Sequence, residues 1–207
     1  AWRLDVAPPR VALVIEGDSV AGAHGRVMAP AARLTTPAED AGSGVAGYAL
    51  LLDGTEVDDF EELSTGLHRA EVVAVDRAGN RSPAAALDFA YDAEPPVLEA
   101  ALAWPADGGD GVVLRLAVTD QPAGLASLHW ASPGGHWQAL GASAVAAGAP
   151  PLAMTFDDAG ARTAMRGEVR LPAEAAARGP LSLTALDRVG NEIRVELALP
   201  PARGEGE

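Results

Sequence analysis

The sequence predicts an all-β protein made of two tandem antiparallel β-sandwiches. One seven-residue phrase occurs twice, as Ala-Val-Asp-Arg-Ala-Gly-Asn at 74–80 and as Ala-Leu-Asp-Arg-Val-Gly-Asn at 185–191. Apolar and polar residues alternate before and after each copy, and turn signals such as Asp53-Gly54 separate the runs. Alternation of period two places one set of side chains on a buried face of a strand. The phrase therefore marks the same corner in two modules.

The repeated phrase is best explained as a strand-to-strand turn with its own cap. A short carboxylate at the end of a strand can accept hydrogen bonds from backbone N–H groups two or three residues later, and glycine can adopt the positive φ of a tight reversal. This structural role is favoured over a catalytic role for the two aspartates. The predicted cap residues are Asp76, Gly79, Asn80, Asp187, Gly190 and Asn191.

Composition excludes several functions. The chain has 207 residues and a formal net charge of −14, so nucleic acid and anionic lipid are not expected as partners. Without cysteine there is no disulfide, thiolate zinc site or thiol nucleophile. No apolar run approaches the roughly 20 residues that cross a bilayer, and no signal peptide is present. We expect no membrane insertion, and residue 1 is expected to be the mature end if the protein is exported.

The first module is predicted to span 1–92, with 1–9 as a leader or linker. The motif Asp-x-x-Pro-Pro opens it at Asp5 and recurs at Asp92, where consecutive prolines favour an extended entrance. Residues 17–25 are expected to form a loop, and Pro37 suggests an edge position for its strand. The expected strands lie at 11–16, 33–40, 46–52, 67–76 and 84–91.

The second module is predicted to span 93–201, followed by a polar tail at 202–207. Asp40 and Asp120 are 80 residues apart, whereas Asp76 and Asp187 are 111 apart. The second module therefore carries about thirty extra residues, which places an enlarged middle at about 131–166. A specialised function is expected there, because loops vary freely on a scaffold. The expected strands lie at 97–104, 112–120, 136–140, 181–187 and 192–199, and Leu128 and Trp130 are expected to match Tyr48 and Leu50 of the first module. Residues 154–170 are expected to form a hairpin about 157–160.

This order of motifs resembles the bacterial immunoglobulin-like repeats of secreted and cell-envelope proteins. The shared elements are Asp5 to Pro9, Asp40 with Ser43-Gly44-Val45, Asp53-Gly54, Gly66-Leu67-His68 and residues 74–80. The resemblance is good over 5–92 and looser over 93–199. It implies two seven-strand-type immunoglobulin-like sandwiches with a spacer, adhesive or scaffold role outside the cytoplasm, in the periplasm or at the cell surface.

An enzymatic alternative comes from Gly17-Asp18-Ser19-Val20. This stretch resembles the nucleophile block of the GDSL-type esterases, in which the serine follows a first strand. Those enzymes also need a Gly-x-Asn-Asp block and a late Asp-x-x-His, and neither occurs in this sequence. Without a base the Ser19 hydroxyl is not activated. We therefore expect no enzyme activity and no catalytic residues.

The binding candidates are aromatic. His129-Trp130 and His136-Trp137 flank the turn Ser132-Pro133-Gly134-Gly135, so a hairpin would place Trp130 opposite Trp137. A core tryptophan pair is the favoured interpretation, and Trp137 is the freer ring. A glycan-binding platform of Trp137, His136 and Trp104 is the alternative to a protein-binding role.

Four aspartates at strand ends are weak candidates for calcium: Asp40, Asp76, Asp120 and Asp187. Calcium takes several oxygen ligands, but no stretch has the regular ligand alternation of an EF-hand loop. Backbone capping explains the four residues better, so no cofactor is expected. The sequence thus predicts a non-catalytic component of a bacterial envelope or surface assembly, with a protein partner and polysaccharide as the second choice.

Overall fold

The computed structural model describes residues 4–131, 138–139, 153–171 and 179–200. The described residues form strands, turns and irregular segments and contain no helix. They therefore include no helix long and apolar enough to cross a bilayer. The chain divides into unit 1, residues 1–93, and unit 2, residues 94–207. We expected the division after residue 92.

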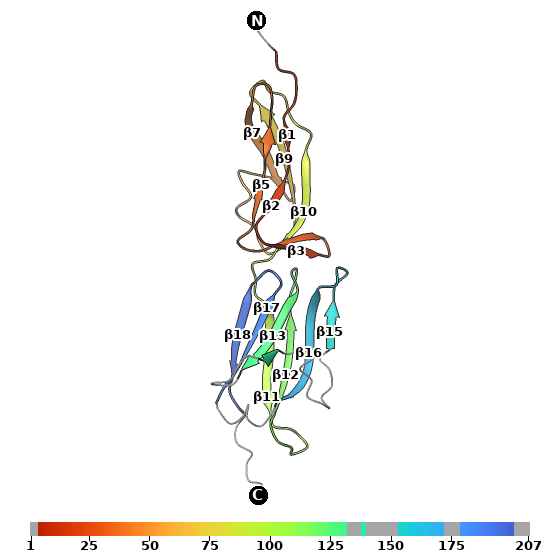
Figure 1. The fold of residues 1–207 in the computed structure, drawn as a ribbon, viewed down its shortest axis with the longest axis vertical. Helices are drawn as coiled ribbons and strands as arrows, with labels where there is room; N and C mark the ends of the chain where they lie inside the picture. Colours follow the sequence, from red (N-terminus) through yellow and green to blue (C-terminus); the bar gives the residue numbers. More distant parts are fainter. Residues whose placement is uncertain (1–3, 132–137, 140–152, 172–178, 201–207) are drawn as a thin grey trace. The chain divides into compact units, whose positions relative to one another are not determined.

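Unit 1 contains ten short to medium strands (Figure 1). They are β1 (Arg10–Val11), β2 (Val14–Glu16), β3 (Ser19–Gly22), β4 (Gly25–Met28), β5 (Arg33–Thr35), β6 (Ala38–Glu39), β7 (Val45–Leu52), β8 (Thr55–Val57), β9 (Gly66–Asp76) and β10 (Ala85–Tyr91).

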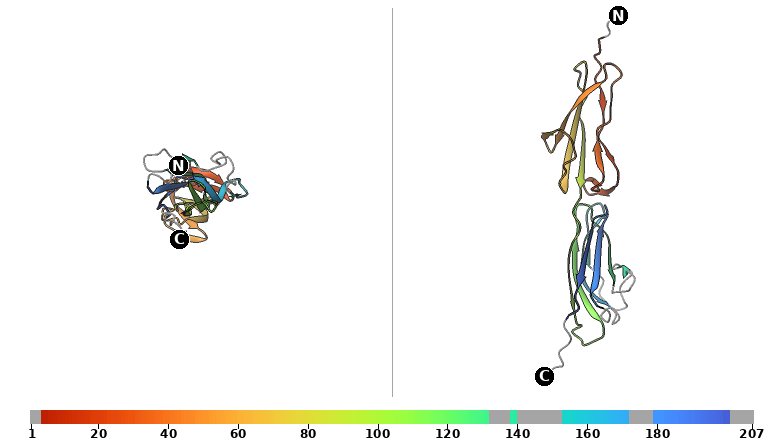
Figure 2. Two further views of the ribbon diagram at one scale, coloured as in Figure 1. Left: turned by 90° about the horizontal axis from the view of Figure 1, so that it is seen from below. Right: turned by 90° about the vertical axis from the view of Figure 1, so that its left-hand side faces the viewer.

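Two layers make up unit 1. The larger sheet has the order β3-β4-β10-β9-β7-β8, in which β4 is parallel to β10 and the other neighbours are antiparallel. The smaller layer is a ribbon in which β1 pairs with β6 and β2 with β5. Figure 2 shows these strands from two further directions. Between the layers lies a core that includes Met28, Ala70 and Phe89.

Two expectations for unit 1 need correction. Residues 17–25 were expected to be a loop, but β3 and the first residue of β4 lie within them, and the β3–β4 hairpin joins the larger sheet beside β10. The sequence conceals this hairpin because its strands are short and rich in glycine. The expected strand at 33–40 is split into β5 and β6 at Pro37, which cannot donate to a ladder.

Unit 2 contains the other eight strands. They are β11 (Val97–Ala103), β12 (Val112–Thr119), β13 (Leu125–Ala131), β14 (Gln138–Ala139), β15 (Ala153–Phe156), β16 (Arg162–Leu171), β17 (Leu181–Asp187) and β18 (Glu192–Leu197).

The strands of unit 2 have the immunoglobulin-like order. One run is β11-β12-β16-β15 and the other is β14-β13-β17-β18, all antiparallel, which corresponds to strands A-B-E-D and C′-C-F-G. The single pair Leu125–Arg162 links the two runs. The core between them is a continuous cluster around Leu114, Leu128, Met165 and Leu183, each 1% exposed or less.

The two units differ in one part of the fold. Strands β11, β12, β13, β17 and β18 of unit 2 have counterparts in the β1–β2 segment, the β5–β6 segment, β7, β9 and β10 of unit 1. The pair β15–β16 has no counterpart, although all of residues 4–93 are described. Unit 1 is therefore an immunoglobulin-like sandwich without strands D and E, and the seven-strand plan implied by the resemblance is incomplete there.

Truncation of the core of unit 2 should be costly. Leu114→Ala removes a side chain that is 0% exposed, so we expect a loss of about 2–5 kcal/mol in the free energy of unfolding. Urea unfolding followed by tryptophan fluorescence measures this, because three of the four tryptophans belong to unit 2. The control is Val97→Ala at a site that is 63% exposed, where a change of similar size would contradict the assignment of the core.

Candidate functional site

The repeated phrase closes a corner in each unit through one carboxylate. In unit 1, Asp76 Oδ1 accepts from the backbone N–H of Asn80 at 2.8 Å and Oδ2 from the Asn80 side-chain amide at 2.8 Å. In unit 2, Asp187 Oδ1 accepts from the backbone N–H groups of Val189, Gly190 and Asn191 at 2.8, 2.6 and 2.8 Å. Both aspartates are buried, so their oxygens replace water as partners for these N–H groups.

A second aspartate in each unit caps the neighbouring corner. Asp40 Oδ2 accepts from the N–H of Gly44 at 2.6 Å, and Asp120 Oδ2 accepts from Gly124 at 2.7 Å. The two corners of a unit are then joined by their backbones. The N–H of Arg77 donates to Gly44 O at 3.0 Å, as that of Arg188 does to Gly124 O at 2.9 Å. Each unit therefore has a pole at which two capped turns support each other.

These carboxylates also form the strongest candidates for metal ligands. In unit 1, Asp5, Asp40 and Asp76 offer oxygens that all lie within 4.8 Å of one another. In unit 2, oxygens of Asp120 and Asp187 lie equally close. A hard cation such as calcium suits such oxygens, but backbone N–H groups already point at them, including that of Ser43, which donates to Asp5 Oδ2 at 2.6 Å. Backbone capping stays the favoured interpretation and calcium the weaker alternative, which a melting temperature measured with calcium and with chelator would test.

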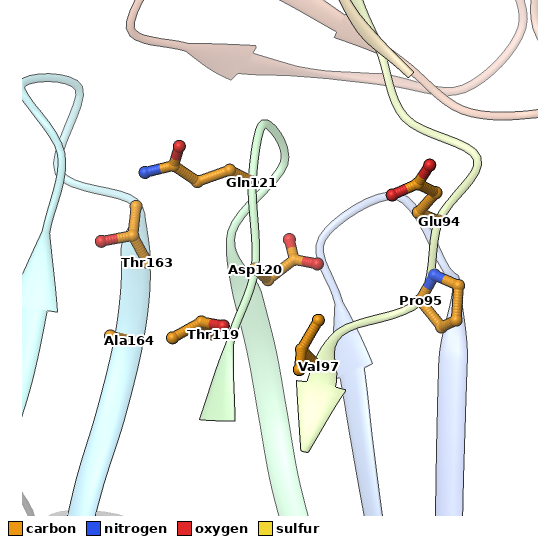
Figure 3. A pocket seen from close by; sticks show the side chains of 8 residues that line it. All are labelled: Glu94, Pro95, Val97, Thr119, Asp120, Gln121, Thr163 and Ala164. Atoms are coloured by element: carbon orange, nitrogen blue, oxygen red, sulfur yellow. The ribbon is translucent and has the colours of Figure 1, made fainter. Parts of the chain in front are cut away.

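A shallow pocket of about 340 Å³ lies beside Asp120 in unit 2 (Figure 3). The side chain of Gln121 extends toward Thr163 across one part of it, while Glu94 and Val97 line the other. The mixture of hydroxyl, amide and carboxylate groups could hold a small polar ligand. Sequence reasoning missed this pocket because it is formed by residues from three separate strand ends.

A histidine–aspartate contact in unit 1 was also missed. His68 Nδ1 lies 2.7 Å from Asp53 Oδ2, and Nε2 lies 2.7 Å from the carbonyl oxygen of Ser64. The backbone N–H of Arg69, and then the His68 ring, lower the pKa of Asp53 below its ordinary value. Both ring nitrogens face acceptors, so the His68 ring ties the β7–β8 turn to the segment before β9. It is a structural tie.

The aromatic candidates divide into buried and undescribed residues. Trp130 is 6% exposed within the core of unit 2, and Trp104 is partly buried against the same core. In the register of β13 and β14, Trp130 lies opposite Gln138, whereas a four-residue turn was expected to place it opposite Trp137. His136 and Trp137 lie outside the described residues.

The proposed nucleophile of the esterase alternative has a different environment. Ser19 lies at the start of β3, and its hydroxyl oxygen accepts a hydrogen bond from Arg26 Nε on β4 at 3.1 Å. The backbone oxygen of Ser19 accepts from the same guanidinium at 2.8 Å. A guanidinium stays protonated and cannot remove a proton from serine. The contact instead stabilises the β3–β4 hairpin.

Among known proteins, the chain is similar to several solved structures. No family model matches the sequence, and no curated protein matches it. The solved structures with similarity include bovine butyrophilin, at 12% identity over 94% of this chain and 100% of that chain with a TM-score of 0.39. They also include a chimeric titin Z1Z2 tandem carrying an exogenous GRGDS peptide from fibronectin, at 14% identity, 81% and 90% coverage and a TM-score of 0.24. The fold assignment itself depends on the strand order of unit 2.

Loss of the Asp187 cap should destabilise unit 2. In Asp187→Ala three partly buried N–H groups lose their acceptor, so we expect a decrease of about 1–3 kcal/mol in the free energy of unfolding. Urea unfolding followed by fluorescence measures it. The matched control is Asp158→Ala in the exposed β15–β16 turn. Equal stability of the two variants would contradict the capping role.

The Asp53 contact predicts an acid-dependent loss of stability. Because the pKa of Asp53 is lowered in the folded chain, its contribution is present above about pH 4 and is lost as pH falls through the folded pKa. Asp53→Asn should therefore be less stable than the parent at pH 7, by no more than about 1 kcal/mol for this half-exposed side chain, and nearly equal near pH 2.

The measurement is urea unfolding by circular dichroism at the two pH values. The matched control is Glu56→Gln, an exposed carboxylate on the next strand. A difference between Asp53→Asn and the parent that is the same at both pH values would contradict the linkage.

Proposed function

We propose that this protein is a non-catalytic, protein-binding component of a bacterial envelope or surface assembly, exported to the periplasm or cell surface. The immunoglobulin-like sandwich serves many proteins as a scaffold for interactions, and function lies in the surfaces it presents. The resemblance of residues 5–92 to bacterial envelope repeats supports the location. The acidic surface supports a partner that is neither nucleic acid nor anionic lipid.

The observation that carries this proposal is that the side chains with catalytic potential make structural hydrogen bonds. Among the described residues, Asp76, Asp187 and Asp40 accept from backbone N–H groups of turns, and Ser19 accepts from Arg26. His68 is held between a carboxylate and a carbonyl oxygen. These groups hold turns and strand ends together, which is the arrangement of a scaffold.

Binding is proposed to occur at one of two places. The first is the enlarged middle of unit 2, about 131–166, which extra chain length distinguishes from unit 1. The second is an unpaired strand edge, where a partner can add a strand through main-chain hydrogen bonds.

The test is cross-linking of the full chain in its source envelope, followed by affinity recovery and mass spectrometry. We expect one protein recovered in a constant ratio, with cross-links to residues within 131–166 or to an edge strand. Replacement of 141–151 by a glycine–serine linker of equal length, which leaves β15 and β16 intact, tests the first place. Removal of 202–207 is the control.

Recovery of polysaccharide without a protein in constant ratio would contradict the proposal and favour the glycan alternative. In that case oligosaccharides should quench tryptophan fluorescence in the parent chain. Trp137→Ala, with the same unfolding curve as the parent, should abolish the quenching.

A further inference from the structure

The β5–β6 segment of unit 1 has one unpaired edge. Its other edge pairs with β1 and β2, and the N–H of Ala12 donates to Pro37 O at 3.0 Å. Main-chain groups of successive residues in a strand point to opposite sides. The N–H and C=O groups of Leu34, Thr36 and Ala38 therefore point to the edge that no strand of residues 4–93 pairs with. The main-chain groups of Pro37 point toward β1, so the N–H group that proline lacks is not missing from the unpaired edge.

The equivalent edge in unit 2 is occupied. With the 80-residue offset, Leu34, Thr36 and Ala38 correspond to Leu114, Leu116 and Val118, which pair with Val169, Gly167 and Met165 of β16. The three residues of unit 2 are 0%, 6% and 0% exposed. Their counterparts in unit 1 are only half-buried. The pairing of β16 accounts for the difference.

The opposite layer of unit 1 is uncovered at the same place. Tyr48 on β7 lies beside Ala74, a core residue of β9, so its side chain belongs to the inner face of the sheet. It is nevertheless 46% exposed, whereas its counterpart Leu128 is 1% exposed. In unit 2 the strand that matches β7 contacts β16 at Leu125–Arg162. Within residues 4–93, unit 1 has no strand in the position that corresponds to β16, and the inner face of its sheet has an exposed tyrosine there.

The segment 58–65 fills this place only in part. Phe60, 8% exposed, and Leu63 pack on the core that also includes Leu34. The polar contacts of the segment go elsewhere, such as Ser64 O to His68 and the N–H of Glu61 to Asp59. Among the described residues no hydrogen bond runs from 58–65 to 33–39. Two apolar side chains therefore cover the core without using the edge.

The chain beside this edge is strongly acidic. The segment 58–65, whose Phe60 and Leu63 pack on the core that includes Leu34, carries four exposed carboxylates and no arginine. These are Asp58, Asp59, Glu61 and Glu62. A segment that lies here meets a negative potential, which favours basic side chains on its outer face.

We infer that an extended segment of a protein partner, with alternating apolar and basic residues, adds as an antiparallel strand to β5–β6. The chain itself shows the pattern that fits, since β16 turns Met165, Val169 and Leu171 inward and exposes Arg166 and Arg170. This inference rests on the proposed protein-binding function and names the edge and the chemistry of its partner.

The experiment uses the full chain labelled with ¹⁵N and a synthetic peptide with the sequence of residues 162–171. We expect saturable binding that slows amide hydrogen exchange at Leu34, Thr36 and Ala38 at least tenfold. Thr36→Pro, which removes one outward N–H, should weaken binding at least tenfold. The matched control Thr36→Val keeps that N–H and should bind as the parent does.

Charge is tested separately. The double variant Glu61→Lys/Glu62→Lys should weaken binding several-fold at low salt, while Glu99→Lys on β11 of unit 2 should leave it unchanged. A peptide of the same composition in scrambled order should not protect the three amides.

The inference is overturned if the peptide does not bind, if it binds without protecting these amides, or if the scrambled peptide protects them equally. Concentration-dependent protection without peptide would assign the edge to a second copy of the chain and would also overturn it. If cross-linking recovers a protein partner held elsewhere on the surface, the proposed function stands and this inference fails.

Discussion

The interaction on which both units depend is a carboxylate that accepts backbone N–H groups where a central strand ends. Asp76 and Asp187 are almost fully buried, and each folds the chain back onto itself so that the next strand returns beside β9 or β17. A buried carboxylate without such donors would carry a large desolvation cost. The turn and the aspartate therefore stabilise each other, and neither is expected to persist alone.

The caps also explain how two modules of unequal size have similar poles. Asp40 and Asp120 hold the neighbouring turns through Gly44 and Gly124, and one backbone hydrogen bond joins the corners of each unit. The thirty-residue difference between the modules falls between these two capped corners in the sequence, in the part of the chain that holds β15 and β16. The start of β16 reaches the capped pole, where the N–H of Asp120 donates to Thr163 O at 3.0 Å.

The absence of strands D and E makes unit 1 smaller and also leaves part of its inner surface exposed. A two-stranded ribbon faces a larger sheet, so residues that would be core in a complete sandwich are half-buried, and one is a tyrosine with almost half its surface exposed. Phe60 restores part of the apolar contact. Unit 1 therefore has an unpaired strand edge next to an acidic segment, and the corresponding edge of unit 2 is paired with β16.

The sequence by itself determined the fold class and the corners. Period-two alternation and the two copies of Asp-Arg-x-Gly-Asn depend on neighbours within a few residues, so β9, β17 and their caps could be predicted from local chemistry. Tertiary structure alone decided which edges are paired. The β3–β4 hairpin, the register of Trp130 with Gln138 and the His68–Asp53 contact join residues whose proximity depends on the path of the chain. The unpaired side of β5–β6 belongs to the same class, because an edge is defined by the strand that is missing beside it.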